Sequence, residues 1–126
     1  MNNAKYIELT GVTDHTDEQA AVMAERCKQH ARLIHYAFGL GTEVGELQDA
    51  VKKVLAYGKP LDVVNIKEEL GDIKWYFARL CKLFNLTIEE IDETNINKLQ
   101  KRYGDKFTEH AALNRDLEAE RKILEE

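Results

Sequence analysis

Two short acidic segments have the residue types and the spacing of a metal site. Residues 43–46 read EVGE and residues 69–72 read ELGD, so each segment holds two carboxylates three positions apart with a glycine between them. At 3.6 residues per turn, side chains at positions i and i+3 lie on the same face of a helix. The two segments supply four candidate metal ligands and catalytic residues: Glu43, Glu46, Glu69 and Asp72.

The chemistry of these four acids favours a hard divalent cation. Carboxylates gathered beside an apolar core repel one another and are costly to leave without a positive partner. Ligand sets made only of oxygen suit Mg²⁺, with Mn²⁺ as a close substitute. None of the 4 histidines supplies the Glu-x-x-His element of a di-iron bundle. The sequence therefore predicts Mg²⁺ as the cofactor.

A segment further along the chain carries the opposite charge. Asn95, Lys98 and Arg102 fall on one face of a further predicted helix. Lys and Arg neutralise phosphate oxygens that a metal does not hold. Beside metal-loaded acids, this face would be a receptor for phosphates, whereas on its own it would be a solvated polar face.

The elements that must position these residues are helices. Strand-like alternation is scarce, so we expect an all-α fold, an antiparallel bundle of roughly four to five helices. Apolar residues keep one helical phase over about 30–56 and again over about 62–84, and the turn YGKPLD joins the two. Both acidic pairs lie along the same edge of their apolar stripes, so an antiparallel hairpin would bring the four carboxylates together. Gly39 and Gly41 leave a break in the first of these helices as an alternative.

Shorter elements are expected around this hairpin. We expect an irregular lead-in over residues 1–16, a short helix capped by Asp17, a helix opened by a capping box of Thr87 and Glu90, and a tail helix over residues 108–126. A chain of 126 residues is most simply one domain. Its catalytic helical core would be residues 30–107.

Three glycines near the acids also call for an explanation. Gly39 lies on the acid edge of its helix, where a missing side chain would leave space for a ligand one turn before Glu43. Gly45 and Gly71 lie off the main apolar stripes. They would let another helix or a subunit backbone come close, or serve helix packing alone.

Composition and charge exclude several other classes of protein. The formal net charge of −5 disfavours a general nucleic-acid binder, for which a basic surface is expected. No apolar run reaches the length of a signal peptide or a membrane span, so a cytoplasmic protein is expected. Cys27 and Cys81 fall in amphipathic patterns and are expected to be buried reduced thiols, not a disulfide or a zinc site.

The acidic segments resemble the signature of the MazG-like all-α nucleoside triphosphate pyrophosphohydrolases, which is E-x-x-E, a spacer, and E-x-x-D. The downstream segment NINKLQKRYGDKF is similar to the family's Asn-x-x-Lys segment, which ends in Arg-Tyr/Phe. The resemblance covers about residues 30–107, and the tail is similar to the tails of small single-domain phage and bacterial members. It implies cleavage of a (deoxy)nucleoside triphosphate between the α- and β-phosphates, giving the monophosphate and pyrophosphate.

The same resemblance implies roles for individual residues. The four acids would hold Mg²⁺, while Lys98 and Arg102 would contact phosphates with Asn95 nearby. Glu68, next to Glu69, would orient the attacking water or would be an exposed helix acid.

Further candidates for substrate binding lie near the acids on the two long helices. Arg32 and His35 could project beside the acid edge of the first helix, and Tyr76 and Arg79 beside that of the second. Lys53, beyond Glu46, would contact phosphate or be solvated.

Two rival functions are considered. A Nudix hydrolase also contains an EELG string, but Val64 and Asn65 stand where its motif needs Arg-Glu, and Asp72 stands where it needs an apolar residue. The non-enzymatic alternative is a small helical oligomeric interaction module whose acids are only solvated surface.

Oligomerisation is expected from the length of the first long helix. A helix over residues 30–56 would be about 40 Å long, against a diameter of about 36 Å for a compact chain of this size. We therefore expect the bundle to be completed in a homodimer or a dimer of dimers, with the tail helix docking on a neighbour.

Overall fold

The computed structural model describes residues 2–125, so the first residue of the predicted lead-in and the last residue of the tail lie outside it. Within the described range the chain forms only helices and connecting segments, which confirms the all-α class. It is divided into more helices than expected, because both ends of the chain contain short helical segments. In chain order the elements are α1 (Asn3–Thr10), the 3-10 turn η1 (Gly11–Thr13), α2 (Asp17–Gln29), α3 (Ala31–Tyr57), α4 (Val63–Phe84), α5 (Ile88–Tyr103), α6 (Glu109–Leu113) and α7 (Leu117–Glu125).

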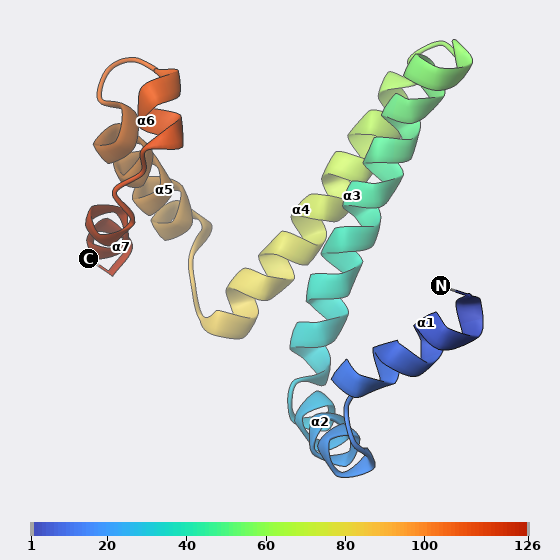
Figure 1. The fold of residues 1–126 in the computed structure, drawn as a ribbon. Helices are drawn as coiled ribbons and strands as arrows, with labels where there is room; N and C mark the ends of the chain where they lie inside the picture. Colours follow the sequence, from blue (N-terminus) through green and yellow to red (C-terminus); the bar gives the residue numbers. More distant parts are fainter. Residues whose placement is uncertain (1, 126) are drawn as a thin grey trace.

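The two longest helices, α3 and α4, form the predicted antiparallel hairpin (Figure 1). α3 runs unbroken through its glycines, so the alternative of a break near Gly39 or Gly41 is wrong. The helix ends where Gly58 adopts a left-handed conformation (φ 61°), which costs glycine little because it has no Cβ. α4 begins after Asp62, whose side chain accepts hydrogen bonds from two backbone N–H groups of the first turn.

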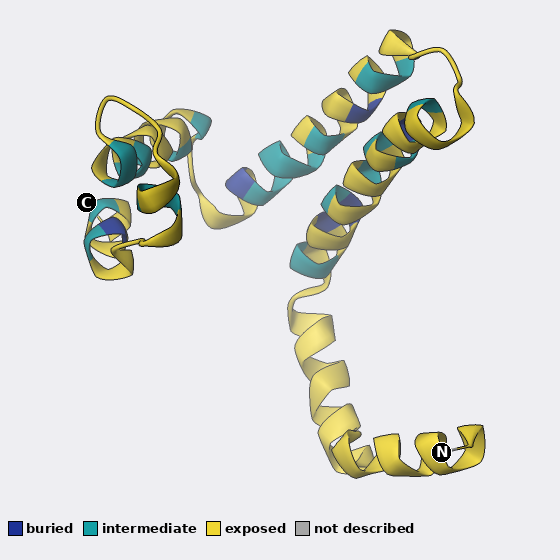
Figure 2. Ribbon diagram, turned by 45° about the horizontal axis from the view of Figure 1, so that its top comes forward, coloured by how far each residue is buried: buried dark blue, intermediate teal, exposed yellow. Residues whose placement is uncertain are grey.

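Most of the buried residues lie in the interface between the arms of this hairpin (Figure 2). Tyr36, Gly39 and Ala50 are buried on α3, and Glu69 and Cys81 are buried on α4. The core is narrow because each helix of the pair buries only the stripe of residues that faces the other helix. A carboxylate inside it stands out, since charged side chains are almost never buried unless they are paired.

The segment before α3 departs from the sequence prediction. An irregular lead-in is predicted, but α1 and η1 occupy residues 3–13. α1 forms because the Asn2 side chain accepts a hydrogen bond from the backbone N–H of Lys5 and so caps the helix. α2 is capped by Thr16, in a capping box with Gln19, and not by Asp17. Every residue of α1 and α2 is exposed, so this arm has no core of its own (Figure 2). The prediction that Cys27 is buried is therefore wrong, whereas Cys81 on α4 is buried as predicted.

α6 and α7 both pack on α5, to one side of the hairpin (Figure 1). α5 opens with the predicted capping box of Thr87 and Glu90. The tail, predicted as one helix, forms two, because the backbone leaves the helical region at Asn114 (φ −116°, ψ 67°). Asp116 then accepts a hydrogen bond from the backbone N–H of Ala119, and α7 begins.

Candidate metal centre

Three acids from the two arms of the hairpin converge. Glu43 comes from α3, Glu69 and Asp72 come from α4, and one carboxylate oxygen of each lies within 4.8 Å of the others. Glu69 is buried, Glu43 is half-buried and Asp72 is exposed, so the group reaches from the interior to the surface. Two oxygens bound to one hard divalent cation at roughly 2.1–2.5 Å lie at most about 5 Å apart. The three carboxylates are therefore close to the spacing of ligands on one ion. Around Mg²⁺, at about 2.1 Å from each oxygen, that spacing is at most about 4.2 Å, which small side-chain rotations would reach.

The electrostatics of this group also favour a cation. The pKa of Glu43 is raised from its ordinary value of 4.5, first by desolvation and then by the charges of Glu46, Asp72 and Glu69. A raised carboxyl pKa means that the ionised form is disfavoured where it stands. A bound metal would reverse the effect, because it favours the deprotonated ligand. The donors are all carboxylate oxygens, which suits a hard divalent ion.

Two further predicted catalytic acids lie at the edge of the group. Glu46 is exposed one turn beyond Glu43 and lies outside the group of three, although its charge acts on Glu43. Glu68 is exposed on α4 beside Glu69. The structure thus places the fourth predicted ligand near the other three, but not at ligand distance from all of them.

A polar contact that the sequence analysis missed holds the buried acid. The Asn65 side-chain amide donates a hydrogen bond from Nδ2 to Oε1 of Glu69 over 2.6 Å, one helical turn away. The available signal was an amide four residues before a candidate ligand, a spacing that brings side chains together on a helix. That pattern is common, and only the burial of Glu69 makes the contact notable.

Among the predicted substrate contacts on α3, Lys53 is within the electrostatic influence of the acids, and Arg32 lies toward the start of the helix. Lys53 forms an ion pair with Asp49 (3.0 Å). This contact raises the pKa of Lys53, with smaller contributions from Glu46 and Glu69. Arg32 is exposed near the start of α3, about 16 Å along the helix from the acids.

An aromatic ring occupies the space beside Gly39. The sequence predicts room for a ligand there, but a Cβ built on Gly39 would overlap the ring of Tyr76, so that prediction is wrong. His35 lies edge-on to Tyr76, with ring centroids 6.0 Å apart. Arg79 donates a hydrogen bond to the Tyr36 hydroxyl (3.3 Å). An aromatic group therefore borders the acids one helical turn away.

The residues predicted to bind phosphate on α5 form hydrogen bonds within α5 and with α7. Lys98 donates to the side-chain oxygen of Asn95 (2.7 Å). Arg102 donates through Nε and a terminal nitrogen to the two carboxylate oxygens of Glu120 on α7, over 2.8 and 2.6 Å. Arg115 also donates to Glu120 (2.7 Å). The described chain does not bring these α5 residues together with the acids of the hairpin (Figure 1).

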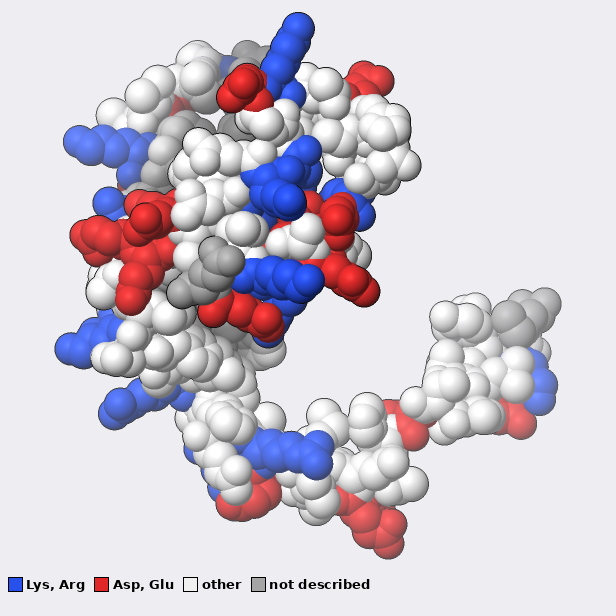
Figure 3. Space-filling view, turned by 90° about the vertical axis from the view of Figure 1, so that its left-hand side faces the viewer, with Lys and Arg blue, Asp and Glu red and all other residues white. Residues whose placement is uncertain are grey.

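Charges of both signs are mixed on the face of the molecule that includes α5, α6 and α7 (Figure 3). On the face shown in Figure 3, Lys and Arg side chains are interspersed with Asp and Glu, and no broad basic patch appears. That pattern does not resemble the continuous basic surface expected of a nucleic-acid binder.

Comparison with known proteins decides the family. The family model described as MazG nucleotide pyrophosphohydrolase domain matches residues 28–107. The chain belongs to the MazG family. The match spans the whole of the α3–α4 hairpin and α5, and it leaves α6 and α7 outside.

A phage protein is similar to this MazG chain. The gene 37 protein of Mycobacterium phage L5 is 32% identical to it over 83 residues, which cover 60% of this chain and 70% of the relative. No solved structure matches the chain significantly. The MazG family indicates a nucleotide pyrophosphohydrolase, with a nucleotide as substrate.

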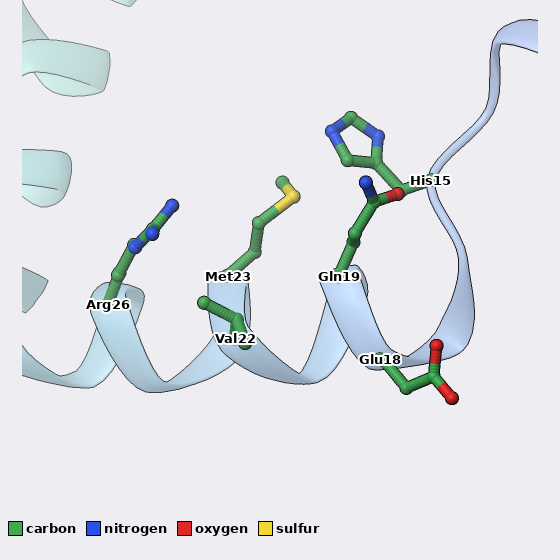
Figure 4. A pocket seen from close by; sticks show the side chains of 6 residues that line it. All are labelled: His15, Glu18, Gln19, Val22, Met23 and Arg26. Carbon is green, nitrogen blue, oxygen red and sulfur yellow. The ribbon is translucent and has the colours of Figure 1, made fainter.

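A surface hollow lies along α2, outside the MazG match. Figure 4 shows a hollow along α2, where His15, Gln19, Met23 and Arg26 project from successive turns. α2 and His15, two residues before it, supply all of its lining, so the hollow is an open groove with no opposing wall. No helix within residues 2–125 combines the length and the apolar character that crossing a membrane requires.

Proposed function

We propose that this chain is a Mg²⁺-dependent nucleoside triphosphate pyrophosphohydrolase, which cleaves a (deoxy)nucleoside triphosphate to the monophosphate and pyrophosphate. The observation that carries the proposal is the convergence of Glu43 from α3 with Glu69 and Asp72 from α4, in a chain that belongs to the MazG family. Three like charges from two helices repel one another at this distance, and a bound cation would offset the repulsion.

The acids have different parts in this proposal. Glu43, Glu69 and Asp72 hold Mg²⁺, with Mn²⁺ able to substitute, and Glu46 completes the negative edge one turn away. When bound, such a metal draws charge from the phosphates and lowers the pKa of a bound water. To Glu68, exposed beside Glu69, we assign the acceptance of a proton from that water.

The phosphates need cations, and one lies beside the acids. Lys53 is exposed and the charges of Glu46 and Glu69 act on it, so we assign its ammonium group to an oxygen of a metal-bound polyphosphate. On the opposite side of the acids, His35 and Tyr76 form the aromatic border, and we assign the nucleoside to them. We assign Arg32, near the start of α3, to the part of the substrate that lies farthest from the metal.

Asn95, Lys98 and Arg102 enter the site only if α5 approaches the hairpin. Asp72 lies about 18 Å from the end of α4, and Lys98 lies about 15 Å from the start of α5. These lengths are similar, so α5 folding back about the short link at residues 85–87 would bring Lys98 beside Asp72. The α5 helix of a second subunit could supply the same residues.

We further propose that the protein is a homodimer or a dimer of dimers. Val44, Val51 and Leu55 on α3 are exposed, as are Val63 and Leu70 on α4. Helical spacing puts all five on the edge of the apolar stripes that lies away from the acids. Monomeric proteins rarely expose a contiguous apolar patch of this kind. A second copy of the hairpin fits it, because the same stripe on both partners is self-complementary and completes a bundle of four long helices.

The test is a screen of the purified protein against the common ribo- and deoxynucleoside triphosphates. Pyrophosphate and monophosphate should appear together with Mg²⁺ present and should be absent with EDTA. Release of orthophosphate and a diphosphate would contradict the proposal. If no triphosphate is cleaved and Mg²⁺ has no effect on melting, the acids are solvated surface and the protein is a helical interaction module.

A further inference from the structure

The two buried acids of the described chain are held in opposite ways. Glu120 is 3% exposed and forms ion pairs with both Arg102 and Arg115. Glu69 is 5% exposed, and no Lys or Arg within residues 2–125 forms an ion pair with it. Its hydrogen-bond donor is the neutral amide of Asn65. A buried carboxylate without a cationic partner is costly. Glu69 is therefore suited to bind a cation from solution.

A neutral donor is suited to a metal ligand in a way that a cationic donor is not. A guanidinium at position 65 would neutralise Glu69 and compete with an incoming metal. An amide forms a charge-assisted hydrogen bond to one oxygen and leaves the full negative charge in place. Fixing Oε1 also fixes the rotation of the carboxylate plane, and hence the directions of the lone pairs that face Glu43 and Asp72.

We propose that Asn65 is a positioning residue that orients Glu69 for the divalent cation. This inference rests on the proposed function, since it assigns Asn65 to the metal site on which that function depends. Hydrogen-bond partners of metal ligands set ligand orientation and affinity in the same manner in other metalloproteins.

Capping of α4 does not explain the hydrogen bond that the Asn65 side chain makes. Asp62 caps the helix, and it accepts the backbone N–H groups of Val64 and Asn65 over 3.1 Å each. The Asn65 amide is not part of this cap, and its hydrogen bond points along the helix to Glu69. Replacing the amide therefore leaves the cap of α4 intact.

The proposal is tested by titration calorimetry, which measures Mn²⁺ binding directly in the absence of nucleotide. Asn65→Leu keeps the approximate shape of the side chain but removes the donor, Asn65→Ala removes both, and Asn65→Gln keeps an amide. Lys67→Ala, at an exposed position of the same helical turn, is the control. Melting without metal is recorded for each variant, so that a loss of fold is separated from a loss of binding.

We expect Asn65→Leu and Asn65→Ala to bind Mn²⁺ about tenfold more weakly than wild type, and Asn65→Gln to recover much of the loss. The Mg²⁺ concentration for half-maximal activity should rise in parallel, while Lys67→Ala matches wild type. If Asn65→Leu folds and binds Mn²⁺ as wild type does, the inference is overturned while the proposed function stands. A wild-type protein that binds no Mn²⁺ would overturn both.

Discussion

The ring of Tyr76 packs directly on Gly39 across the α3–α4 interface, in space that any other side chain at position 39 would occupy. Gly39 lies one helical turn before Glu43, and Tyr76 lies one turn after Asp72. The contact therefore sets the register and the separation of the two helices next to the acids. The sequence suggests that Gly39 leaves space for a ligand, whereas in the structure Gly39 is a close contact between α3 and α4.

Gly39→Ala should consequently destabilise the hairpin, by about 1–3 kcal/mol, because the added methyl group overpacks a tight contact. It should also weaken Mn²⁺ binding, since the helices must shift beside the acids. Gly41→Ala is the matched control on the same helix, because a Cβ there would meet nothing within 4 Å. The control should stabilise the protein by up to about 1 kcal/mol through helix propensity. Urea unfolding measures both, and equal effects of the two changes would contradict this account of the contact.

Divalent metal should raise the melting temperature of the wild-type protein. A ligand that binds only the folded state at about 100 times its Kd stabilises by roughly 2.7 kcal/mol. Glu69→Ala should remove the response, whereas Glu93→Ala, a change of an exposed acid on α5, should keep it. Scanning fluorimetry with Mg²⁺, Mn²⁺ and EDTA provides the measurement. A response to metal that survives Glu69→Ala would place the ion elsewhere.

The stabilisation by metal should depend on pH with a defined sign. Because the pKa of Glu43 in the folded protein lies above its ordinary value of 4.5, the folded state holds more protons than the unfolded state in the window between the two values. Without metal, this group makes stability fall as pH rises through that window. A metal offsets the repulsion, so the increase in melting temperature with Mg²⁺ should be larger at pH 7.5 than at pH 5. The reverse order, or no difference, would count against the acid cluster as the binding site.

The contact between α5 and α7 should fail in acid. Hydrogen bonds from Arg102, and then from Arg115, lower the pKa of Glu120 to about 2 from an ordinary value of 4.5. A depressed carboxyl pKa stabilises the folded state above the unfolded value, and the contribution is lost as pH falls from about 4.5 to about 2. Limited proteolysis at graded pH should show the tail released in this window. Glu120→Gln should release the tail already at pH 7, and a tail that stays protected in that variant would show that apolar packing holds it.

Assembly through the apolar face of the hairpin predicts a simple change of mass. Leu70→Glu places a charge in the middle of the stripe and should convert the dimer or tetramer to monomer in sedimentation velocity. Leu113→Glu, a change of an equally apolar but more exposed residue on α6, should leave the mass unchanged. A wild-type monomer at micromolar concentration would contradict the assembly.

The hairpin and its acids could be predicted from the sequence because local rules determine them. Helical phase puts Glu43 and Glu69 at one edge, and the short turn after Gly58 forces the arms to be antiparallel. The pairing of Arg102 with Glu120 could not be predicted in this way, because it joins residues 18 positions apart across a tail that breaks at Asn114. Periodicity says which face a residue occupies, but not which element will cover that face.

Small local contacts also escaped prediction in α1 and in the first turn of α4. A single side chain, Asn2, caps α1 and makes a helix where apolar periodicity is weak. Asn65 reads as an ordinary helix residue until Glu69 is seen to be buried. In each case the deciding quantity was a hydrogen bond to one neighbour, which composition and spacing do not determine.

The central claim is that both arms of the hairpin bind one and the same ion. Mn²⁺ titration followed by electron paramagnetic resonance measures this directly in wild type, in Glu43→Gln from α3 and in Asp72→Asn from α4. We predict saturable binding by wild type and a loss of about tenfold or more in each variant, because each removes a charged oxygen ligand from the shared site. Unchanged Mn²⁺ affinity in either variant would show that its arm does not contribute to the site, and would contradict the account.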